Sequence, residues 1–352
     1  MDPDLPLNPS DRLHRATGLS SGQSAGSRKA WSALFVLIAL LVISADSPVS
    51  GQASLKHVSF MPQWIPQAQF AGYLVAHDKG FYRRAGLDVT LVPGGPGKNC
   101  FTALAAGQVT FCTGWLSTAI QFDGSGLKIV NLAQMMQRSS LLLIAKKSSG
   151  IRTPKDLNGK RVGFWVGEFD VPILVFLKKH HLNVKMIPNY TTVTMFLKGA
   201  VDAIAAMWYN EYHLIIDSGL NPDDLTVLRF KDLGVDFPED GLYCMKSTFQ
   251  ADPAMCKAFA AASIQGWKYA FKHQEEAVDI VMKYAKAANT GTNRAHQQWM
   301  LAAMKELMLP KAPHGEMGKL SLSDYEKVGK ALKSLYLIDH LPKYQDFYRG
   351  RQ

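Results

Sequence analysis

A tryptophan set among two prolines and three glutamines is the first feature of this sequence that suggests binding chemistry. The segment PQWIPQAQF (62–70) follows HVSFM (57–61), which has the character of a short strand. Prolines suit a turn and glutamines suit a helix start, but neither requires Trp64. An indole offers a flat face on which an aromatic heterocycle can stack, and the amides of Gln67 and Gln69 can bind its edge. We expect a ligand-binding loop here, with burial of Trp64 under the loop as the alternative.

Two glutamates are candidate partners for the polar edge of such a ligand. Glu168 lies in the run GEF and Glu211 in the run YNE. A carboxylate accepts hydrogen bonds from an exocyclic amine or a protonated ring nitrogen. Glu211 could instead be a helix-start carboxylate stabilised by the helix dipole. We expect further donors and acceptors from Tyr209, Asn210 and Tyr243.

Anion binding is a second chemistry that the sequence allows. The loop GGPGKN (94–99), which contains Gly95, precedes a predicted helix, so its backbone N–H groups could hold an anion. It lacks the Lys-Ser/Thr pair of a nucleotide-binding P-loop. Arg138 could meet a phosphate or a carboxylate, although a surface ion pair is the commoner fate of an arginine.

Patterns for catalysis and for metal binding do not stand out. The sequence shows no Ser/His/Asp set in a suitable context, no GxSxG turn, no Cys-x-x-Cys and no Cys/His cluster. His180 and His181 lie among lysines at the end of a predicted helical run, a position typical of solvent-exposed residues. The four cysteines lie in apolar contexts that suit buried thiols as well as disulfides, and three complete pairings stay open: Cys100, Cys112, Cys244 and Cys256. We predict a binding protein without catalytic activity, metal or cofactor.

An alternation of strands and helices must position these side chains. Short β-rich runs alternate with helical runs up to about residue 251, and the pattern from Asp252 onward is helical only. Such alternation predicts βαβ units and a largely parallel sheet. Asp252 and Pro253 are typical cap and first-turn residues of a helix. The expected fold class is α/β with a helical C-terminal extension.

One internal repeat indicates two related lobes. LAAGQVTFCTGW (104–115) and LKGAVDAIAAMW (197–208) each show a helix end, a glycine, a strand and a tryptophan. Ligands of open α/β sheets collect at the carboxyl ends of strands. We therefore expect Trp115 and Trp208 to border a site, and Trp165 follows a predicted strand in the same way. Each of these aromatic residues could instead serve the core.

The first 53 residues predict export. Arg28 and Lys29 precede the apolar run WSALFVLIALLVISA (31–45), and small residues follow it, as in a secretory signal peptide. An uncleaved anchor is the alternative. The net charge of +10 lies outside this segment, whose four basic and four acidic residues cancel. Without an arginine-rich run or zinc-finger spacing, we read the charge as a solvated surface and predict no nucleic-acid partner.

Beyond these features, a series of motifs makes the chain resemble a known family. They are GYLVAHDKGFYRRAGLDVT (72–90), PGGP (93–96), GWLS (114–117), NLAQMMQRS (131–139), LNGKRVGFWVGEFD (157–170), MWYNEY (207–212), EDGLY (239–243) and EEAVDIV (275–281). Together they resemble periplasmic solute-binding proteins of ABC importers, within the nitrate-, sulfonate- and thiamine-precursor-binding superfamily. The branch that binds pyrimidine precursors of thiamine is the most similar.

The resemblance implies a type II periplasmic-binding fold, in which two hinge-linked lobes close on a ligand. It implies a signal peptide (1–53), a discontinuous first lobe (54–147 and 239–352) and a second lobe (148–238), with hinges near 146–151 and 235–241. It also implies a periplasmic monomer, a small aromatic ligand and a membrane permease as partner. The full set of expected ligand-binding residues is Trp64, Gln67, Gln69, Tyr73, Gly95, Trp115, Leu116, Arg138, Trp165, Gly167, Glu168, Phe169, Tyr209, Asn210, Glu211 and Tyr243.

Other members of the superfamily supply the alternatives. Riboflavin, a sulfonate, nitrate or another aromatic compound could be the ligand, and the lobes could serve a separate sensory partner. One related enzyme, a thiamine-pyrimidine synthase, consumes its own histidine and pyridoxal phosphate and uses iron. In this sequence Phe70 stands where that histidine is expected, and only Cys244 remains of the enzyme's cysteine cluster. We therefore predict transport rather than synthesis.

Overall fold

The computed structural model describes residues 54–165, 167, 169–189, 191–309 and 316–351. The predicted signal peptide and Glu168 lie outside this set. Within it, no helix is both long enough and apolar enough to cross a membrane.

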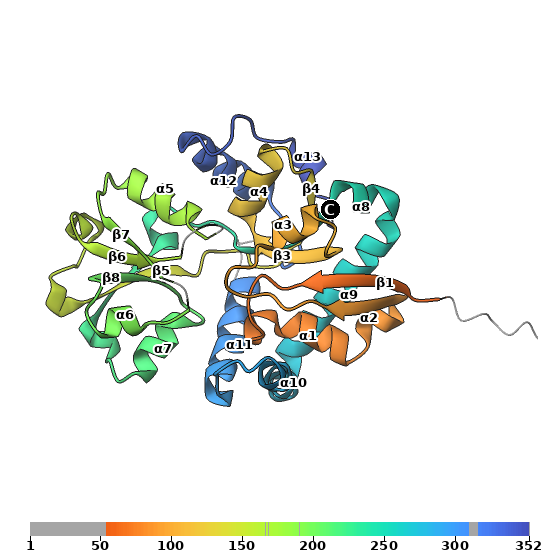
Figure 1. Ribbon diagram of the computed structural model, residues 1–352, viewed down its shortest axis with the longest axis horizontal. Helices are drawn as coiled ribbons and strands as arrows, with labels where there is room; N and C mark the ends of the chain where they lie inside the picture. The colour runs from red at the N-terminus through yellow and green to blue at the C-terminus, as the bar shows by residue number, and fades with distance from the viewer. Residues whose placement is uncertain (1–53, 166, 168, 190, 310–315, 352) are drawn as a thin grey trace, which may run out of the picture. The chain divides into compact units, whose positions relative to one another are not determined.

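The first sheet combines four strands from the first part of the described chain with one strand that follows the second sheet in the sequence (Figure 1). β1 runs parallel to β2 and β3, whereas β10 runs antiparallel to β3 and β4. The strand order is β2 (Leu87–Leu91), β1 (Lys56–Met61), β3 (Phe111–Trp115), β10 (Asp240–Met245) and β4 (Ile129–Gln134).

The second sheet repeats this plan with the middle of the chain. β6 is parallel to β7 and β8, and β5 is antiparallel to β8 and β9. Its order is β7 (Lys185–Pro188), β6 (Arg161–Phe164), β8 (Ala203–Met207), β5 (Leu141–Lys146) and β9 (Leu225–Arg229). The two copies of the sequence repeat end in β3 and β8, which occupy the same place in their sheets, so the predicted pair of related lobes is present. All five residues of each strand are buried.

Helices connect the strands of both sheets. In the first lobe these are α1 (Ala71–Asp78), α2 (Phe81–Arg84), α3 (Cys100–Ala105) and α4 (Leu116–Gly124). In the second they are α5 (Val171–Lys179), α6 (Thr194–Leu197) and α7 (Glu211–Asp217). Short 3-10 turns are η1 (Ala68–Phe70), η2 (Lys147–Ser149), η3 (Pro154–Leu157), η4 (Pro222–Asp224) and η5 (Phe230–Leu233).

The predicted helical C-terminal part follows β10. It consists of α8 (Lys246–Ala251), α9 (Pro253–Lys272), α10 (Gln274–Ala287), α11 (Arg294–Met308), α12 (Leu322–Ser334) and α13 (Tyr344–Phe347). As predicted, Asp252 caps α9: its side chain accepts a hydrogen bond from the Met255 N–H, and Pro253 is the first helical residue. Helix α9 packs closely on α1, and α11 packs on α10 and η1.

The chain passes between the sheets at 135–140 and at 230–239. The second connection overlaps the predicted hinge at 235–241. The first connection, at 135–140, shows that the predicted boundary at 147/148 is wrong, because β5 pairs with β8 and β9 and so belongs to the second sheet. The crossing therefore precedes β5 instead of following it at 146–151.

Candidate functional site

One pocket is lined at the carboxyl ends of four parallel strands, β1 and β3 of the first sheet and β6 and β8 of the second, where ligands of open α/β sheets collect. Segments that follow β1, β6 and β8 contribute to the lining, whereas β3 contributes only its last residue, Trp115. The empty space is about 360 Å³, part of it open to solvent. Its lining residues are Gln63, Trp64, Gln67, Gln69, Trp115, Trp165, Phe169, Met207, Tyr209, Asn210 and Glu211.

Aromatic rings from both lobes meet in this pocket. Phe169, in the loop after β6, meets Trp64 nearly edge-on, with ring centroids 5.8 Å apart and an interplanar angle of 85°. The same ring lies 4.9 Å from Trp115 at 70°. Phe169 thus brings the second lobe into contact with two tryptophans of the first. Trp165, also from the second lobe, is nearly fully buried.

A buried aspartate organises the polar side of the pocket. Asp240, the first residue of β10, accepts hydrogen bonds from Gln63 Nε2 at 2.7 Å and from Gln69 Nε2 at 2.8 Å. Gln67 Nε2 donates in turn to Gln69 Oε1 at 2.7 Å. Burial raises the pKa of Asp240 to about 6, and the hydrogen bonds from Gln69 and Gln63 limit the rise. Near neutral pH the carboxyl is therefore mainly an ionised acceptor.

This arrangement leaves one glutamine oxygen without a donor. An ionised carboxylate can only accept hydrogen bonds, so both glutamines must turn their NH₂ groups toward Asp240. The oxygen of Gln69 is then satisfied by Gln67. Gln63 Oε1 is buried, and no donor among the described residues reaches it. A buried acceptor of this kind is costly unless a ligand or water pairs with it.

Glu211 supplies a second carboxyl group to the pocket. Glu211 is the first residue of α7, as the helix-start alternative predicted. Its side chain is nevertheless buried, and it accepts hydrogen bonds from Met207 N at 2.9 Å and from Asn210 Nδ2 at 2.8 Å. Burial raises the pKa of Glu211 to about 7, although these hydrogen bonds oppose the rise. Both protonation states are therefore accessible near neutral pH.

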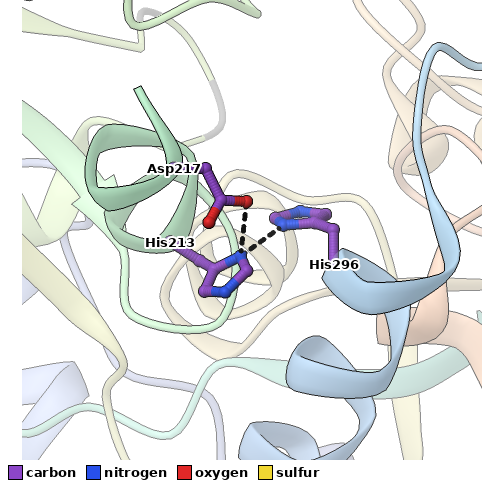
Figure 2. A group of neighbouring side chains, drawn as sticks. All are labelled: His213, Asp217 and His296. Atoms are coloured by element: carbon purple, nitrogen blue, oxygen red, sulfur yellow. Dashed lines mark hydrogen bonds and ion pairs between the residues drawn. The ribbon is translucent and has the colours of Figure 1, made fainter. Parts of the chain in front are cut away.

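The hydrogen-bond chain from Glu211 continues out of the pocket to the other lobe. Asn210 Oδ1 lies 2.9 Å from His296 Nε2 on α11. His296 Nδ1 lies 2.9 Å from His213 Nδ1, which is 3.2 Å from Asp217 Oδ2 (Figure 2). Burial, followed by the charge of nearby His213, lowers the pKa of His296 to about 4. His296 is thus a neutral imidazole at neutral pH and contacts the second lobe from the first.

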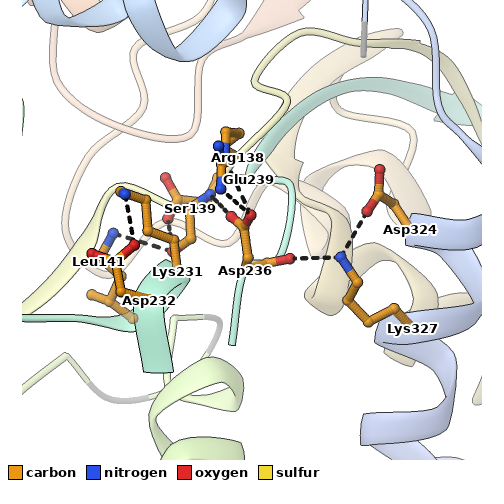
Figure 3. Close-up of polar contacts among 9 residues, drawn as sticks. All are labelled: Arg138, Ser139, Leu141, Lys231, Asp232, Asp236, Glu239, Asp324 and Lys327. Atoms are coloured by element: carbon orange, nitrogen blue, oxygen red, sulfur yellow. Dashed lines mark hydrogen bonds and ion pairs between the residues drawn. The ribbon is translucent and has the colours of Figure 1, made fainter. Parts of the chain in front are cut away.

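The two connections between the sheets are joined by hydrogen bonds (Figure 3). Glu239 accepts from Ser139 Oγ at 2.9 Å, from Ser140 N at 2.8 Å and from Ser140 Oγ at 2.7 Å. Arg138 pairs with Asp236 at 2.9 Å. Burial raises the pKa of Glu239 to about 8, and adjacent Asp240 adds to the rise. We call Ser139, Ser140 and Glu239 the hinge node.

The structure brings nine of the sixteen expected residues together in the pocket and places six others elsewhere. Tyr73 packs edge-on against Trp267, Leu116 is fully buried at the start of α4, and Tyr243 lies in the core against Phe101. Arg138 is paired with Asp236 in the hinge region. Two glycines, Gly95 and Gly167, have positive φ values of 137° and 90°. Glu168 is outside the described residues.

Two lining residues, Gln63 and Met207, were not expected, and neither were Asp240 behind the lining and the placement of Trp208. Gln63 and Met207 directly precede expected residues, so their sequence neighbours were the available signal. Asp240 carried no signal of its own. Trp208 lies outside the pocket lining and packs edge-on against Trp299. All four cysteines are buried thiols that form no disulfide, with Cys244 Sγ and Cys256 Sγ 4.0 Å apart.

Comparison with known proteins gives three relatives that span most of the chain. The formylaminopyrimidine-binding protein of Halalkalibacterium halodurans is 22% identical over 85% of this chain and 92% of its own length. The riboflavin-binding protein RibY of Chloroflexus aurantiacus is 22% identical over 73% and 79%. The 4-amino-5-hydroxymethyl-2-methylpyrimidine phosphate synthase of Legionella pneumophila is 24% identical over 82% and 89%.

Solved structures share the fold. The alkanesulfonate-binding protein SsuA of Xanthomonas axonopodis pv. citri, bound to MOPS, superposes with a TM-score of 0.63 at 16% identity, over 85% of this chain and all of SsuA. The two-lobed periplasmic-binding-protein fold expected from the sequence is therefore confirmed. A family model described as NMT1/THI5 like matches residues 67–277. The chain belongs to the NMT1/THI5-like family.

Proposed function

We propose that this protein is an extracytoplasmic substrate-binding component of an ABC importer. In this proposal it captures a small aromatic heterocycle, an aminopyrimidine of the thiamine-precursor class, between its lobes and delivers it to a membrane permease. The names of the formylaminopyrimidine-binding relative and of the solute-binding structural neighbour support this role. The predicted signal peptide supports the location.

The observation that carries the proposal is that Gln63 Oε1, in an aromatic pocket, receives no hydrogen bond from any residue that the structure describes. An exocyclic amine on a flat ring would donate to this oxygen while the ring stacks on Trp64. The carboxyl of Glu211 could bind a second edge of the ring, since it accepts when ionised and donates when protonated. Both features suit an aminopyrimidine.

The charges at the pocket argue against anionic ligands. None of the described lining residues is Lys, Arg or His, whereas Glu211 lines the pocket and Asp240 lies directly behind its glutamines. Sulfonate, nitrate and phosphate groups need cationic or N–H donors to replace their hydration. Arg138, the expected anion partner, is already paired with Asp236. A neutral or protonated heterocycle is the better match.

Riboflavin is the second candidate, and the RibY relative is the observation that favours it. Its isoalloxazine system could also stack on Trp64. The space of about 360 Å³ at the pocket includes open solvent, so the enclosed part is smaller. This size favours a single ring over a tricyclic flavin.

We further propose that the protein has no catalytic activity. The position at which the related synthase carries its reacting histidine is Phe70, which is fully buried. Cys244 is buried beside Cys256 instead of standing in the pocket. The synthase of Legionella pneumophila is nevertheless similar over most of the chain. Incubation with pyrimidines, pyridoxal phosphate or flavins should therefore give binding without any product detectable by mass spectrometry.

A matched pair of ligands tests the binding mode. Isothermal titration calorimetry would compare 4-amino-5-hydroxymethyl-2-methylpyrimidine with the same ring lacking its amine, with riboflavin and an alkanesulfonate as further arms. Loss of the amine should cost about 1–3 kcal/mol, because Gln63 Oε1 stays unpaired. In Gln63→Met this difference should largely vanish. Equal affinity of the two pyrimidines, or preference for the sulfonate, would overturn the proposal.

A further inference from the structure

Three side chains of metal-ligand type converge outside the pocket, where α7 meets α11. His213 and Asp217 are one turn apart on α7, and His296 lies in the first turn of α11 (Figure 2). One ligand atom from each residue lies within 4.8 Å of the other two. His213 Nδ1 is 2.9 Å from His296 Nδ1 and 3.2 Å from Asp217 Oδ2. Three groups that bear lone pairs therefore surround one point.

The surrounding hydrogen bonds fix the tautomer of His296. Asn210 donates its Nδ2 to Glu211 at 2.8 Å, so its Oδ1 faces His296 Nε2 at 2.9 Å and accepts from it. The Nε2 atom of His296 therefore carries the hydrogen, and Nδ1 presents a lone pair toward His213. Metal-binding histidines are commonly oriented in this way, with the second ring nitrogen donating to an oxygen. His213 is held by stacking on Trp299, at 4.7 Å and 17°.

Without a cation, His296 Nδ1 and Asp217 Oδ2 are two acceptors for the single hydrogen that His213 Nδ1 can carry. We propose that His213, Asp217 and His296 form a binding site for a divalent transition-metal ion of the zinc class. Two imidazoles and one carboxylate are a common zinc ligand set, with a water in the fourth position. Ligand atoms 2.0–2.1 Å from a tetrahedral zinc ion are about 3.3 Å apart. The distances of 2.9 and 3.2 Å are close to this separation.

Access to the site is from the side of Asp217. The side chain of Asp217 is 47% exposed and that of His213 is 18% exposed, whereas His296 is buried. An ion could enter from solvent and keep a water ligand there. Because α7 belongs to the second lobe and α11 to the first, the bound ion would join the two lobes beside the pocket.

The experiment is a zinc titration of the chelator-treated full chain by calorimetry, with cobalt(II) absorption as a second measurement. We expect one ion per chain and a visible cobalt band typical of nitrogen and oxygen ligands. His213→Gln and Asp217→Asn should each lower zinc affinity about tenfold or more, since each removes a direct ligand. Circular dichroism in the presence of chelator would verify that both variants fold.

His57 provides the matched control. His57 Nδ1 also lies 3.2 Å from an aspartate oxygen, that of Asp88, but no third His, Cys, Asp or Glu among the described residues completes a metal-binding group there. His57→Gln should therefore leave zinc affinity and stoichiometry unchanged. Absence of zinc binding by the unmodified chain, undiminished binding by His213→Gln, or an equal loss in His57→Gln would overturn the proposal.

Discussion

Asp240 shows how one residue can set the chemistry of several others. As an acceptor it orients the amides of Gln63 and Gln69, and through them it fixes which atoms face a ligand. The pocket is therefore polarised before any ligand binds, which reduces the ordering cost of binding. A bound aminopyrimidine would meet an oriented acceptor and an indole face.

Trp64 is the residue whose loss should weaken binding most directly. Replacing Trp64 by Ala removes the stacking face, and we expect the binding free energy for the best pyrimidine to weaken by about 1–3 kcal/mol, which is a loss of affinity of roughly fivefold to 150-fold. Trp64→Phe should recover part of the loss, because a smaller ring can still stack. Calorimetry gives the affinities, and thermal unfolding verifies the fold. An unchanged affinity in Trp64→Ala would refute the stacking role.

The pocket residues at the carboxyl ends of parallel strands could be predicted from the sequence. Asp240, which comes from an antiparallel strand far away in the sequence, could not. Trp64, Trp115 and Glu211 each follow an apolar run, so their place at a strand end was visible. Asp240 begins its strand, and it reaches the same edge only because β10 is antiparallel. Its partners Gln69 and Gln63 are 171 and 177 residues away. No local pattern encodes such a contact.

At the scale of elements, helices α1 and α9 approach each other closely where Gly72 faces Gly266. A Cβ atom at Gly266 would lie 2.0 Å from the Gly72 carbonyl oxygen, and one at Gly72 would lie 2.2 Å from the Trp267 ring. We expect Gly266→Ala to lower the free energy of unfolding by about 1–3 kcal/mol, since overpacking outweighs the gain in helix propensity. Urea unfolding measures this.

Gly291 is the control for this close approach, because a Cβ atom there would meet nothing within 4 Å. Gly291→Ala should stay within about 0.5 kcal/mol of the unmodified chain. If Gly266→Ala were equally harmless, the close approach of α1 and α9 would have to be relieved by a small helix shift.

The hinge node should make stability depend on pH. The pKa of Glu239 is raised to about 8 in the folded protein, so its contribution to stability is complete below the unfolded pKa near 4.5 and is lost as pH rises through about 8. His296, with its pKa lowered to about 4, acts in the opposite sense below about 6.5. From pH 6.5 to 8.5 the loss of stability therefore comes from buried carboxyls: mainly from Glu239, on the order of 1–2 kcal/mol, with a smaller share from Glu211, whose pKa is about 7.

The variant Glu239→Gln tests whether Glu239 causes this pH dependence of stability. The amide has nearly the same shape and can keep hydrogen bonds to Ser139 and Ser140, but it does not ionise. Urea unfolding at pH 6.5, 7.5 and 8.5 should show the variant losing less stability with rising pH than the unmodified chain. Parallel pH profiles would mean that Glu239 does not titrate in this range.

The hinge region also explains why one boundary was misplaced. The segment KSSGIRTPKDLNG (147–159) is polar and contains glycines, as exposed loops do. For that reason a hinge was predicted at its start, near 146–151. The actual first crossing begins with Met135 and Met136, which are fully buried. Gln137, Ser139 and Ser140 follow as buried polar residues. Because the crossing runs inside the protein, its polar groups must be paired there, and no exposed-loop composition marks it in the sequence.

At the scale of the whole described chain, the two sheets share a strand order and contribute loops to one pocket. Only two connections join them, and both are part of one hydrogen-bonded region around Glu239 and Asp240. Such a design allows the lobes to rotate about the connections while each sheet stays intact. A ligand bound to loops of both lobes would favour the closed arrangement by its extra contacts there.

Hydrogen exchange can test closure across the whole molecule. With saturating aminopyrimidine, amides at the carboxyl ends of β1, β3, β6 and β8 should exchange more slowly. Those at 135–140 and 230–239 should do so too, because the closed state becomes more populated. Helix α8, which packs on the first sheet and contributes no lining residue, should be unchanged. Protection limited to the loops of one lobe would mean that the ligand binds without closing the cleft. Protection in both lobes that disappears in Phe169→Ala would show that closure depends on the aromatic contact that Phe169 makes with Trp64 and Trp115.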